Sequence, residues 1–264
     1  QGGRSMLGSY ANVHHATWRD EPVVVKLLLV QPTNVLDMVR IARAAAAAFR
    51  VSLECRGEAL GPIGLCMAPP MCSVIYHRTG DGTLADALGH TADNDCDVDL
   101  EIHDNKRTII RELVGALHTL HERGLSAHGA LKPSNVLLEV RRQRVRSIML
   151  TDFGMDDLRN NMGTMTMVPS AGYTAPEVLC GGEASAASDV YVVGTLIFEI
   201  LTGQAAFGGS NALEVAHRIV SGWRPDVDRA VANDVLADLI RRCWNRETSA
   251  RPSTIQIIQA LDCE

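Results

Sequence analysis

The 264-residue sequence predicts an α+β protein with a small strand-rich section followed by a larger helical section. Two observations predict this division. Runs of β-branched and aliphatic residues recur over residues 6–80, whereas apolar residues recur at helical spacing over residues 81–264. The sequence shows no internal repeat and no low-complexity linker. We therefore expect one domain over residues 6–264 in which strands and helices are largely segregated.

The small section contains strand, helix and strand signals in that order. Residues 23–30 are aliphatic apart from Lys26, and turn residues precede them, which predicts a strand. Residues 33–50 predict a helix, because they include five consecutive alanines at 44–48. The strand pattern returns over residues 63–77.

The larger section begins with a helix on which apolar residues recur about every 3.6 positions. These residues are Ile109, Leu113, Leu117 and Leu120. A β-hairpin is expected next, turning at residues 141–144, and residues 153–172 predict a loop. Further helices are predicted over residues 190–201, 213–220, 235–243 and 255–261.

The composition excludes several classes of protein. Apolar residues make up 46% and charged residues 21%, which is typical of a globular domain. A net charge of −6 and an aromatic content of 4% disfavour nucleic-acid binding, and no apolar run reaches the ~18 residues of a membrane span. The seven cysteines are scattered, so they predict free thiols in a reducing, cytoplasmic compartment rather than a disulfide framework or a zinc site.

Several short motifs occur in a fixed order along the chain. They are Val-Val-Val-Lys ending at Lys26, His-Gly-Ala-Leu-Lys-Pro-Ser-Asn at 128–135, Asp-Phe-Gly at 152–154, Ala-Pro-Glu at 175–177, Asp-Val-Tyr at 189–191, Cys-Trp at 243–244 and Arg-Pro at 251–252. Together they resemble a eukaryotic protein kinase domain over about residues 6–262. The amino-acid sequences at residues 64–66, 191–194 and 243–244 are most similar to those of the tyrosine-kinase-like branch. The resemblance implies a bilobal fold, with a β-rich N-lobe to about residue 80 and a helical C-lobe from about residue 81.

The resemblance also implies a site for ATP and Mg²⁺. Asp152 and Asn135 match the metal ligands, and their oxygen donors suit Mg²⁺. The residues that match nucleotide contacts are Gly8, Val13, Val24, Lys26, Lys132 and Leu137. Val24 is larger than the alanine that the family prefers and is expected to crowd the adenine. The gatekeeper is Ile75 or Tyr76.

Other matched residues have structural roles in the family. Phe153 and His128 match a hydrophobic column between the lobes, and Asp189 matches a residue that supports the catalytic-loop backbone. Glu177 and Arg251 match a buried ion pair. His118 and His121 lie on one predicted helix, but we interpret them as ordinary histidines of the fold rather than metal ligands.

The catalytic base of the family is missing. The family places an aspartate where this chain has Ala130, and no Asp or Glu lies between Gly124 and Leu138. A positioned base contributes typically 10²–10⁴-fold to a rate. This single change therefore predicts severely impaired phosphoryl transfer.

Two further parts of the site depart from the family pattern. The three glycines of the phosphate-covering loop fall at Met6, Gly8 and Ala11, so one glycine remains. The helix that normally supplies a glutamate to Lys26 has no carboxylate at residues 40–45. Asp37 comes too early and Glu54 too late, although a shifted helix would bring Asp37 within reach. Without that glutamate, we expect Lys26 to lose its proton more readily or to take a different partner, for which Asp152 is the first candidate.

These departures favour a pseudokinase that is not an enzyme, with residual ATP phosphotransferase activity left open. It would act as a scaffold or allosteric regulator through protein binding, with weak Mg-ATP binding. One alternative is an active serine/threonine-type kinase whose base is replaced by water or a distant carboxylate. Another is a different transferase on the same fold that uses Lys26, Asn135 and Asp152.

The N-lobe helix is the expected protein-docking surface. Its alanines cover more than one turn, so some of them must face away from the lobe. Arg40, Arg43 and Arg50 would form a charged rim. The partner would be another kinase or a second copy of this chain, as in the RAF-like relatives that the sequence resembles. Alternatively, the alanines pack beneath residues 51–60.

Overall fold

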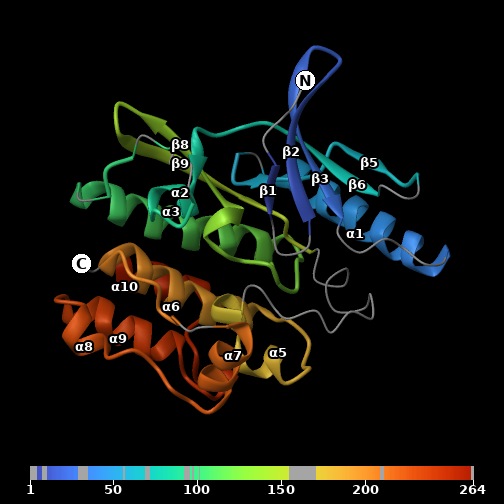
Figure 1. The fold of residues 1–264 in the computed structure, drawn as a ribbon. Coiled ribbons are helices and arrows are strands. Elements are labelled where there is room, and N and C mark those ends of the chain that lie inside the picture. Colours follow the sequence, from blue (N-terminus) through green and yellow to red (C-terminus); the bar gives the residue numbers. More distant parts are fainter. Residues whose placement is uncertain are drawn as a thin grey trace.

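The structure is a computed structural model that carries two β-sheets and a large helical region (Figure 1). The residues it describes are 5–7, 11–28, 35–55, 57–68, 72–91, 96, 98–100, 102–154, 171–208 and 211–262.

The first sheet has five antiparallel strands in the order β1-β2-β3-β6-β5. Their bounds are β1 (Ser5–Leu7), β2 (Ala11–Trp18), β3 (Glu21–Leu28), β5 (Gly64–Cys66) and β6 (Ser73–His77). Arg19 and Asp20 both take positive φ, as a two-residue hairpin between β2 and β3 requires.

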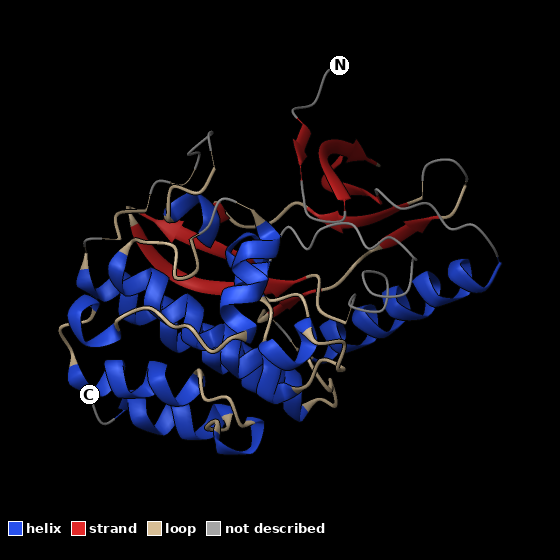
Figure 2. Cartoon of the chain, turned by 60° about the horizontal axis from the view of Figure 1, so that its bottom comes forward, coloured by secondary structure: helices blue, strands red, loops and turns tan. Residues whose placement is uncertain are grey.

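Helix α1 (Val35–Glu54) packs against this sheet. Ile41 and Ala45 of the helix form one buried cluster with side chains of β3 and β6, among them Leu28, Val74 and Tyr76. One end of α1 projects beyond the rest of the molecule (Figures 1 and 2).

The second sheet joins the two sections of the chain, in the order β4-β9-β8-β7. Its strands are β4 (Ala59–Leu60), β7 (Gly82–Thr83), β8 (Val136–Arg141) and β9 (Arg144–Thr151). β4 comes from the first section and pairs in parallel with β9. Arg142 and Gln143 take positive φ in the predicted turn between β8 and β9.

Helices form the larger part of the C-terminal section (Figure 2). The α-helices are α2 (Leu84–Ala87), α3 (His103–Glu122), α5 (Pro176–Leu179), α6 (Ala186–Thr202), α7 (Ala212–Val220), α8 (Val227–Ala230), α9 (Asp234–Cys243) and α10 (Thr254–Asp262). The short 3₁₀ turns are η1 (Pro133–Asn135), η2 (Ala171–Tyr173) and η3 (Thr248–Ala250). Residues 188–200 of α6 are all buried, so this helix is the centre of the large core.

The architecture confirms the predicted α+β fold and most of its elements. The predicted helix at 33–50 is α1, which continues to Glu54 because residues 51–54 contain no glycine or proline to end it. Residues 33 and 34 lie outside the described residues. The helices predicted from residue 190 onward all form, each within a few residues of the expected bounds.

Six cysteines lie in the described part of the chain, and none of these forms a disulfide. Cys55, Cys72, Cys96 and Cys243 are buried, which agrees with the prediction of free thiols within the core. Within the same residues, we find no helix that is both long enough and apolar enough to span a membrane.

Candidate functional site

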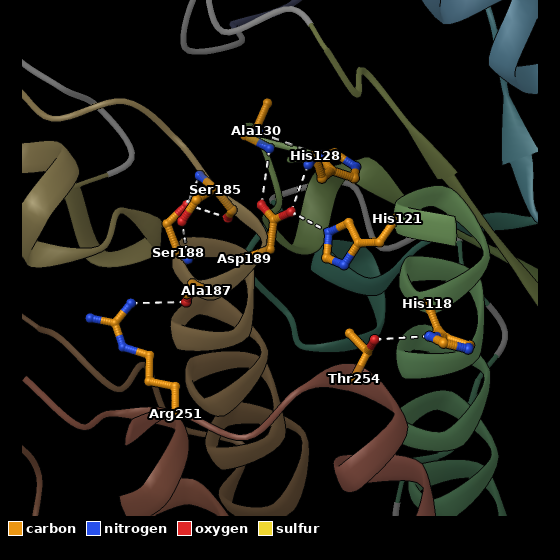
Figure 3. A network of polar contacts seen from close by, with 11 residues as sticks. His118, His121, His128, Ala130, Ser185, Ala187, Ser188, Asp189, Arg251 and Thr254 are labelled. Atoms are coloured by element: carbon orange, nitrogen blue, oxygen red, sulfur yellow. Dashed lines mark hydrogen bonds and ion pairs between the residues drawn. The ribbon is translucent and has the colours of Figure 1, made fainter. Parts of the chain in front are cut away.

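Asp189 fixes the first part of the loop at residues 128–135 through hydrogen bonds to its backbone (Figure 3). Its carboxylate, at the start of α6, accepts hydrogen bonds from the backbone N–H groups of His128 at 2.6 Å and Gly129 at 3.0 Å. The His121 ring lies 2.9 Å from the same carboxylate. Gly129 has a φ of 73°, a conformation that glycine adopts without steric cost. The predicted supporting role of Asp189 is confirmed.

His128, the first residue of this loop, contacts Phe153, with ring centroids 6.1 Å apart in an edge-to-face arrangement. Both side chains are buried. Burial lowers the pKa of His128, so the ring is neutral at pH 7. Its Nδ1 accepts a hydrogen bond from the N–H of Ala130 at 3.3 Å. The predicted column is therefore present at this point.

Ala130 and Asn135 face each other across the turn of the loop. The Asn135 Nδ2 donates to the Ala130 carbonyl oxygen at 2.7 Å, and both residues are buried. This bond orients the amide of Asn135 and leaves its oxygen as the atom suited to bind a cation. The two carboxylates nearest to Ala130 in the sequence lie elsewhere. Glu122 is exposed at the end of α3, and Glu139 on β8 accepts a hydrogen bond from Ser147 at 2.8 Å.

Lys26 and Asp152 form an ion pair between the two sections of the chain. The Lys26 Nζ lies 2.5 Å from Asp152 Oδ2, although 126 positions separate the residues. Side-chain exposure is 12% for Lys26 and 3% for Asp152, so the pair is shielded from solvent. Asp152 has a φ of 65°, an uncommon conformation for a residue other than glycine that often marks a functional site. The sequence-based expectation of this pairing is confirmed.

Tyr76 lies on the same face of the sheet as Lys26. Residue pairs across β3 and β6 are Lys26 with Val74 and Val24 with Tyr76, which places these four side chains on one face. The Tyr76 ring centroid is 5.0 Å from the Lys26 Nζ. Burial, the charge of Asp152 and a hydrogen bond to that residue raise the pKa of Tyr76 well above its usual range.

This register resolves the gatekeeper position in favour of Tyr76, because Ile75 belongs to the opposite face. Side chains alternate between the two faces of a strand, so the pairing of Lys26 with Val74 is enough to place Tyr76 on the Lys26 face. The contact of Tyr76 with the Lys26–Asp152 pair was not anticipated, since the distance between distant segments depends on the tertiary fold.

The remaining predicted nucleotide contacts are placed as follows. Val13 on β2 pairs directly with Lys26, and Leu137 is half-buried on β8. Lys132 is half-buried and directly precedes η1. Gly8 lies outside the described residues, whereas Met6 is in β1 and Ala11 begins β2.

α1 offers Lys26 no glutamate from its sheet-facing side. The buried positions of the helix are Ile41, Ala45 and Ala48. Asp37 lies in the first turn, where its carboxylate is 3.9 Å from Arg40, and Glu54 is exposed at the other end. The two carboxylates of α1 therefore lie outside the buried, sheet-facing positions of the helix.

Glu177 and Arg251 form the predicted ion pair in the C-terminal section. Two hydrogen bonds of 2.7 and 2.8 Å join the guanidinium to the carboxylate. Arg251 also donates to the carbonyl oxygens of Ala187 and Asn245. The side chain of Arg251 is fully buried, so it ties α5, the start of α6 and the chain before α10 together.

The histidines of α3 take part in contacts within the fold (Figure 3). His118 Nδ1 lies 3.0 Å from the hydroxyl of Thr254, and His121 contacts Asp189. Among the described residues, no group of three or more His, Cys, Asp or Glu side chains is arranged to hold a metal ion. This agrees with the interpretation of both as histidines of the fold.

A link between η2 and α6 is a feature that no sequence motif indicates. The Tyr173 hydroxyl donates to Glu199 at 2.9 Å, and the Ala206 N–H donates to the same carboxylate at 3.0 Å. Burial raises the pKa of Glu199 to about 7, although these two bonds act in the opposite direction. The contact anchors the segment that leads into the Ala-Pro-Glu motif at 175–177.

A family model described as the protein kinase domain matches residues 76–261. The chain belongs to the protein kinase domain family. The match covers the loop at 128–135, Asp152 and the Glu177–Arg251 pair, so the geometry described above is that of a kinase domain. The bilobal α+β kinase fold predicted from the sequence is thereby confirmed.

Three relatives are named as kinases. The kinase domain is 29% identical to the dual specificity protein kinase shkC of Dictyostelium discoideum, with 97% of this chain and 49% of the relative covered. It is 25% identical to human mitogen-activated protein kinase kinase kinase 11, with 97% and 30% covered. It is 36% identical to the serine/threonine-protein kinase PkaA of Streptomyces coelicolor, with 57% and 27% covered.

The chain spans at most about half the length of these relatives, and 15% of the mimivirus protein R831, to which it is 25% identical.

The expectation that this domain is not an enzyme is wrong. Relatives that align over nearly the whole chain are named as serine/threonine or dual-specificity kinases, which points to kinase activity. The error has a physical reason. The missing aspartate at Ala130, the eroded glycine loop and the missing helix glutamate predict severely impaired transfer. A general base, however, supplies only a part of the rate enhancement, and positioning and electrostatic stabilisation supply most of the rest.

Proposed function

We propose that this kinase domain transfers the γ-phosphoryl group of Mg-ATP to serine or threonine hydroxyls at a low rate. The observation that carries the proposal is the shielded Lys26–Asp152 pair at 2.5 Å. It brings the cation expected at the α and β phosphates together with the carboxylate expected at the metal. Relatives that are named serine/threonine-protein kinases support the acceptor class.

The residues present fit Mg²⁺. The carboxylate of Asp152 and the amide oxygen of Asn135 are hard oxygen donors, and the metal would take its other ligands from phosphate and water. When bound, Mg²⁺ neutralises charge on the β and γ phosphates. Lys26 would hold the α and β phosphates, and Lys132 would reach the γ-phosphate. Val13 and Leu137 would pack against adenine, with Val24 limiting the affinity.

Ala130 explains the low rate that we propose. In the reaction, the acceptor oxygen bonds to the γ-phosphorus, the bond to the bridging oxygen of ADP breaks, and the hydroxyl proton must leave. The methyl group of Ala130 cannot accept that proton, so it passes to water or to a phosphate oxygen. Positioning by Lys26, Asn135 and Asp152 remains, which is sufficient for slow transfer.

A second function is favoured by the same residue. A domain that binds nucleotide but turns it over slowly can act mainly as a scaffold or allosteric regulator of another protein, and Ala130 supports this role. The motif sequences at residues 64–66, 191–194 and 243–244 support assignment of the domain to the tyrosine-kinase-like branch. The free thiols of the described cysteines support a reducing, cytoplasmic location.

Mg-ATP is expected to stabilise the domain against heat. Ligand at 100 times its dissociation constant adds about 2.7 kcal/mol to the free energy of unfolding, which corresponds to roughly 5–11 °C in melting temperature. The measurement is thermal unfolding with ATP, with and without Mg²⁺, of the wild type, Lys26→Met and Asp152→Asn. Lys26→Met should lose most of the shift, and Asp152→Asn should lose the Mg²⁺-dependent part. An unchanged melting temperature of the wild type in millimolar Mg-ATP would refute nucleotide binding at this site.

A further inference from the structure

The solvent-facing side of α1 carries an apolar stripe. Exposed residues recur at alternating intervals of four and three positions, at Val35, Val39, Ala42, Ala46, Phe49 and Leu53. Exposure is 74% for Val35, 43% for Phe49 and 62% for Leu53, which is high for such large apolar side chains. The stripe is separate from the buried side of the helix, where Ile41 and Ala45 pack against the sheet.

This spacing averages 3.5 residues, the repeat of a helix that packs along a second helix. The stripe covers 19 residues (35–53), so it runs for about 27 Å along the helix at 1.5 Å per residue. Ala42 and Ala46 lie at its middle, where small side chains permit close approach of another backbone. Leu36, beside Val35, is 58% exposed and widens the stripe at its start.

Arginines flank the stripe on one side only. Arg43 and Arg50 directly follow Ala42 and Phe49 and are exposed, so they lie along the same edge of the stripe. Arg40 lies further round the helix on that side. α1 contains two carboxylates, Asp37 in its first turn and Glu54 in its last. Neither lies beside the middle of the helix, so the positive charge of Arg43 has no acidic residue next to it there.

These charges argue against a second copy of the chain as the occupant. An antiparallel pair of α1 helices centred on residue 44, the middle of the stripe, brings the two Arg43 side chains together, and like charges in an interface are unfavourable. A parallel pair places Arg43 and Arg50 opposite Met38 and Ala45, which offer no opposite charge. An acidic edge on a different helix would complement both arginines.

We propose that α1 docks an amphipathic helix of a partner protein, with an apolar seam that covers the stripe and acidic residues that face Arg43 and Arg50. The charge of the domain supports this choice, because the net charge of −6 makes a cationic edge on α1 a local feature rather than a general one. The proposal is independent of phosphoryl transfer.

The test uses two designed peptides of three heptads with leucine at positions a and d. One peptide carries glutamate at positions e and g, and the other carries lysine there. Fluorescence anisotropy with the whole domain should show binding of the glutamate peptide and weaker binding of the lysine peptide by about tenfold or more. Ala46→Glu should abolish binding, whereas Ala232→Glu, which adds the same charge at an exposed site elsewhere, should not.

Charge reversal provides the decisive comparison. Arg43→Glu/Arg50→Glu should lose affinity for the glutamate peptide and gain affinity for the lysine peptide, each by about tenfold or more. Both residues are exposed, so this variant should fold. Failure of the wild type to bind either peptide, or equal binding of both, would overturn the proposal. So would sedimentation of the isolated domain as a dimer that Ala46→Glu dissociates, because a second copy would then occupy the stripe.

Discussion

Replacing Ala130 by aspartate is expected to raise the rate of phosphoryl transfer by about 10²–10⁴-fold, the usual contribution of a positioned base. The substitution adds a proton acceptor to a loop that is already held in place by Asp189 and Asn135. The base acts only during the chemical step, so kcat should rise while KM for ATP changes little. The gain should lie at the lower end of the range, because the sheet-facing side of α1 offers Lys26 no glutamate and catalytic groups that act as a unit do not contribute additively.

Ala130→Asn is the matched control for this experiment. Asparagine has nearly the same size as aspartate but cannot accept the proton, so its kcat should stay near that of the wild type. The measurement is incorporation of labelled phosphate from Mg-ATP into a serine/threonine peptide mixture. Equal rates for the aspartate and asparagine variants would show that another group already serves as the base.

Replacing Arg251 by methionine is expected to destabilise the domain by about 3–5 kcal/mol, the usual effect of removing one partner of a buried ion pair. Glu177 would keep its carboxylate without the guanidinium, and the carbonyl oxygens of Ala187 and Asn245 would lose their donor. The midpoint of thermal unfolding should fall by roughly 6–20 °C. Arg241→Met is the control, because the pair of Arg241 with the exposed Asp228 is open to solvent and its loss should change the midpoint little.

The pH dependence of the stability of Arg251→Met provides a second test of this ion pair. Burial favours the neutral form of Glu177, but the hydrogen bonds and charge of Arg251 outweigh it and lower the pKa of this carboxyl. The stability that the pair supplies is therefore present above the unfolded pKa of about 4.3 and is lost as the pH falls through the lower folded value. The variant should lose less stability on acidification than the wild type. An equal acid sensitivity of both proteins would contradict this assignment.

Much of the site could be predicted because its residues occur in contiguous motifs. Short motifs mark each part by its residue types and by its position in the chain. These parts are the loop at 128–135, the hairpin that leads to Asp152, and the Glu177–Arg251 pair. The Lys26–Asp152 contact was predicted by elimination of carboxylates on α1, and the structure confirms it. The sequence leaves the gatekeeper open between Ile75 and Tyr76, since a shift of one residue in a strand moves every side chain to the other face.

Features that depend on long-range pairing could not be predicted. β4 is two residues long and joins the second sheet in parallel, which no local pattern indicates. The link between Tyr173 and Glu199 joins residues that carry no motif between them. The enzymatic role was judged wrongly because the missing base was given more weight than the retained groups that position ATP.

The central claim is that this kinase domain transfers phosphate slowly through the Lys26–Asp152 pair. The most direct test is transfer from labelled Mg-ATP to a serine/threonine peptide mixture by the wild type and by Lys26→Met, followed over hours with the enzyme near the substrate concentration. We expect slow, Mg²⁺-dependent labelling by the wild type and its loss in Lys26→Met. Absence of labelling by the wild type, or equal labelling by both proteins, would contradict the claim.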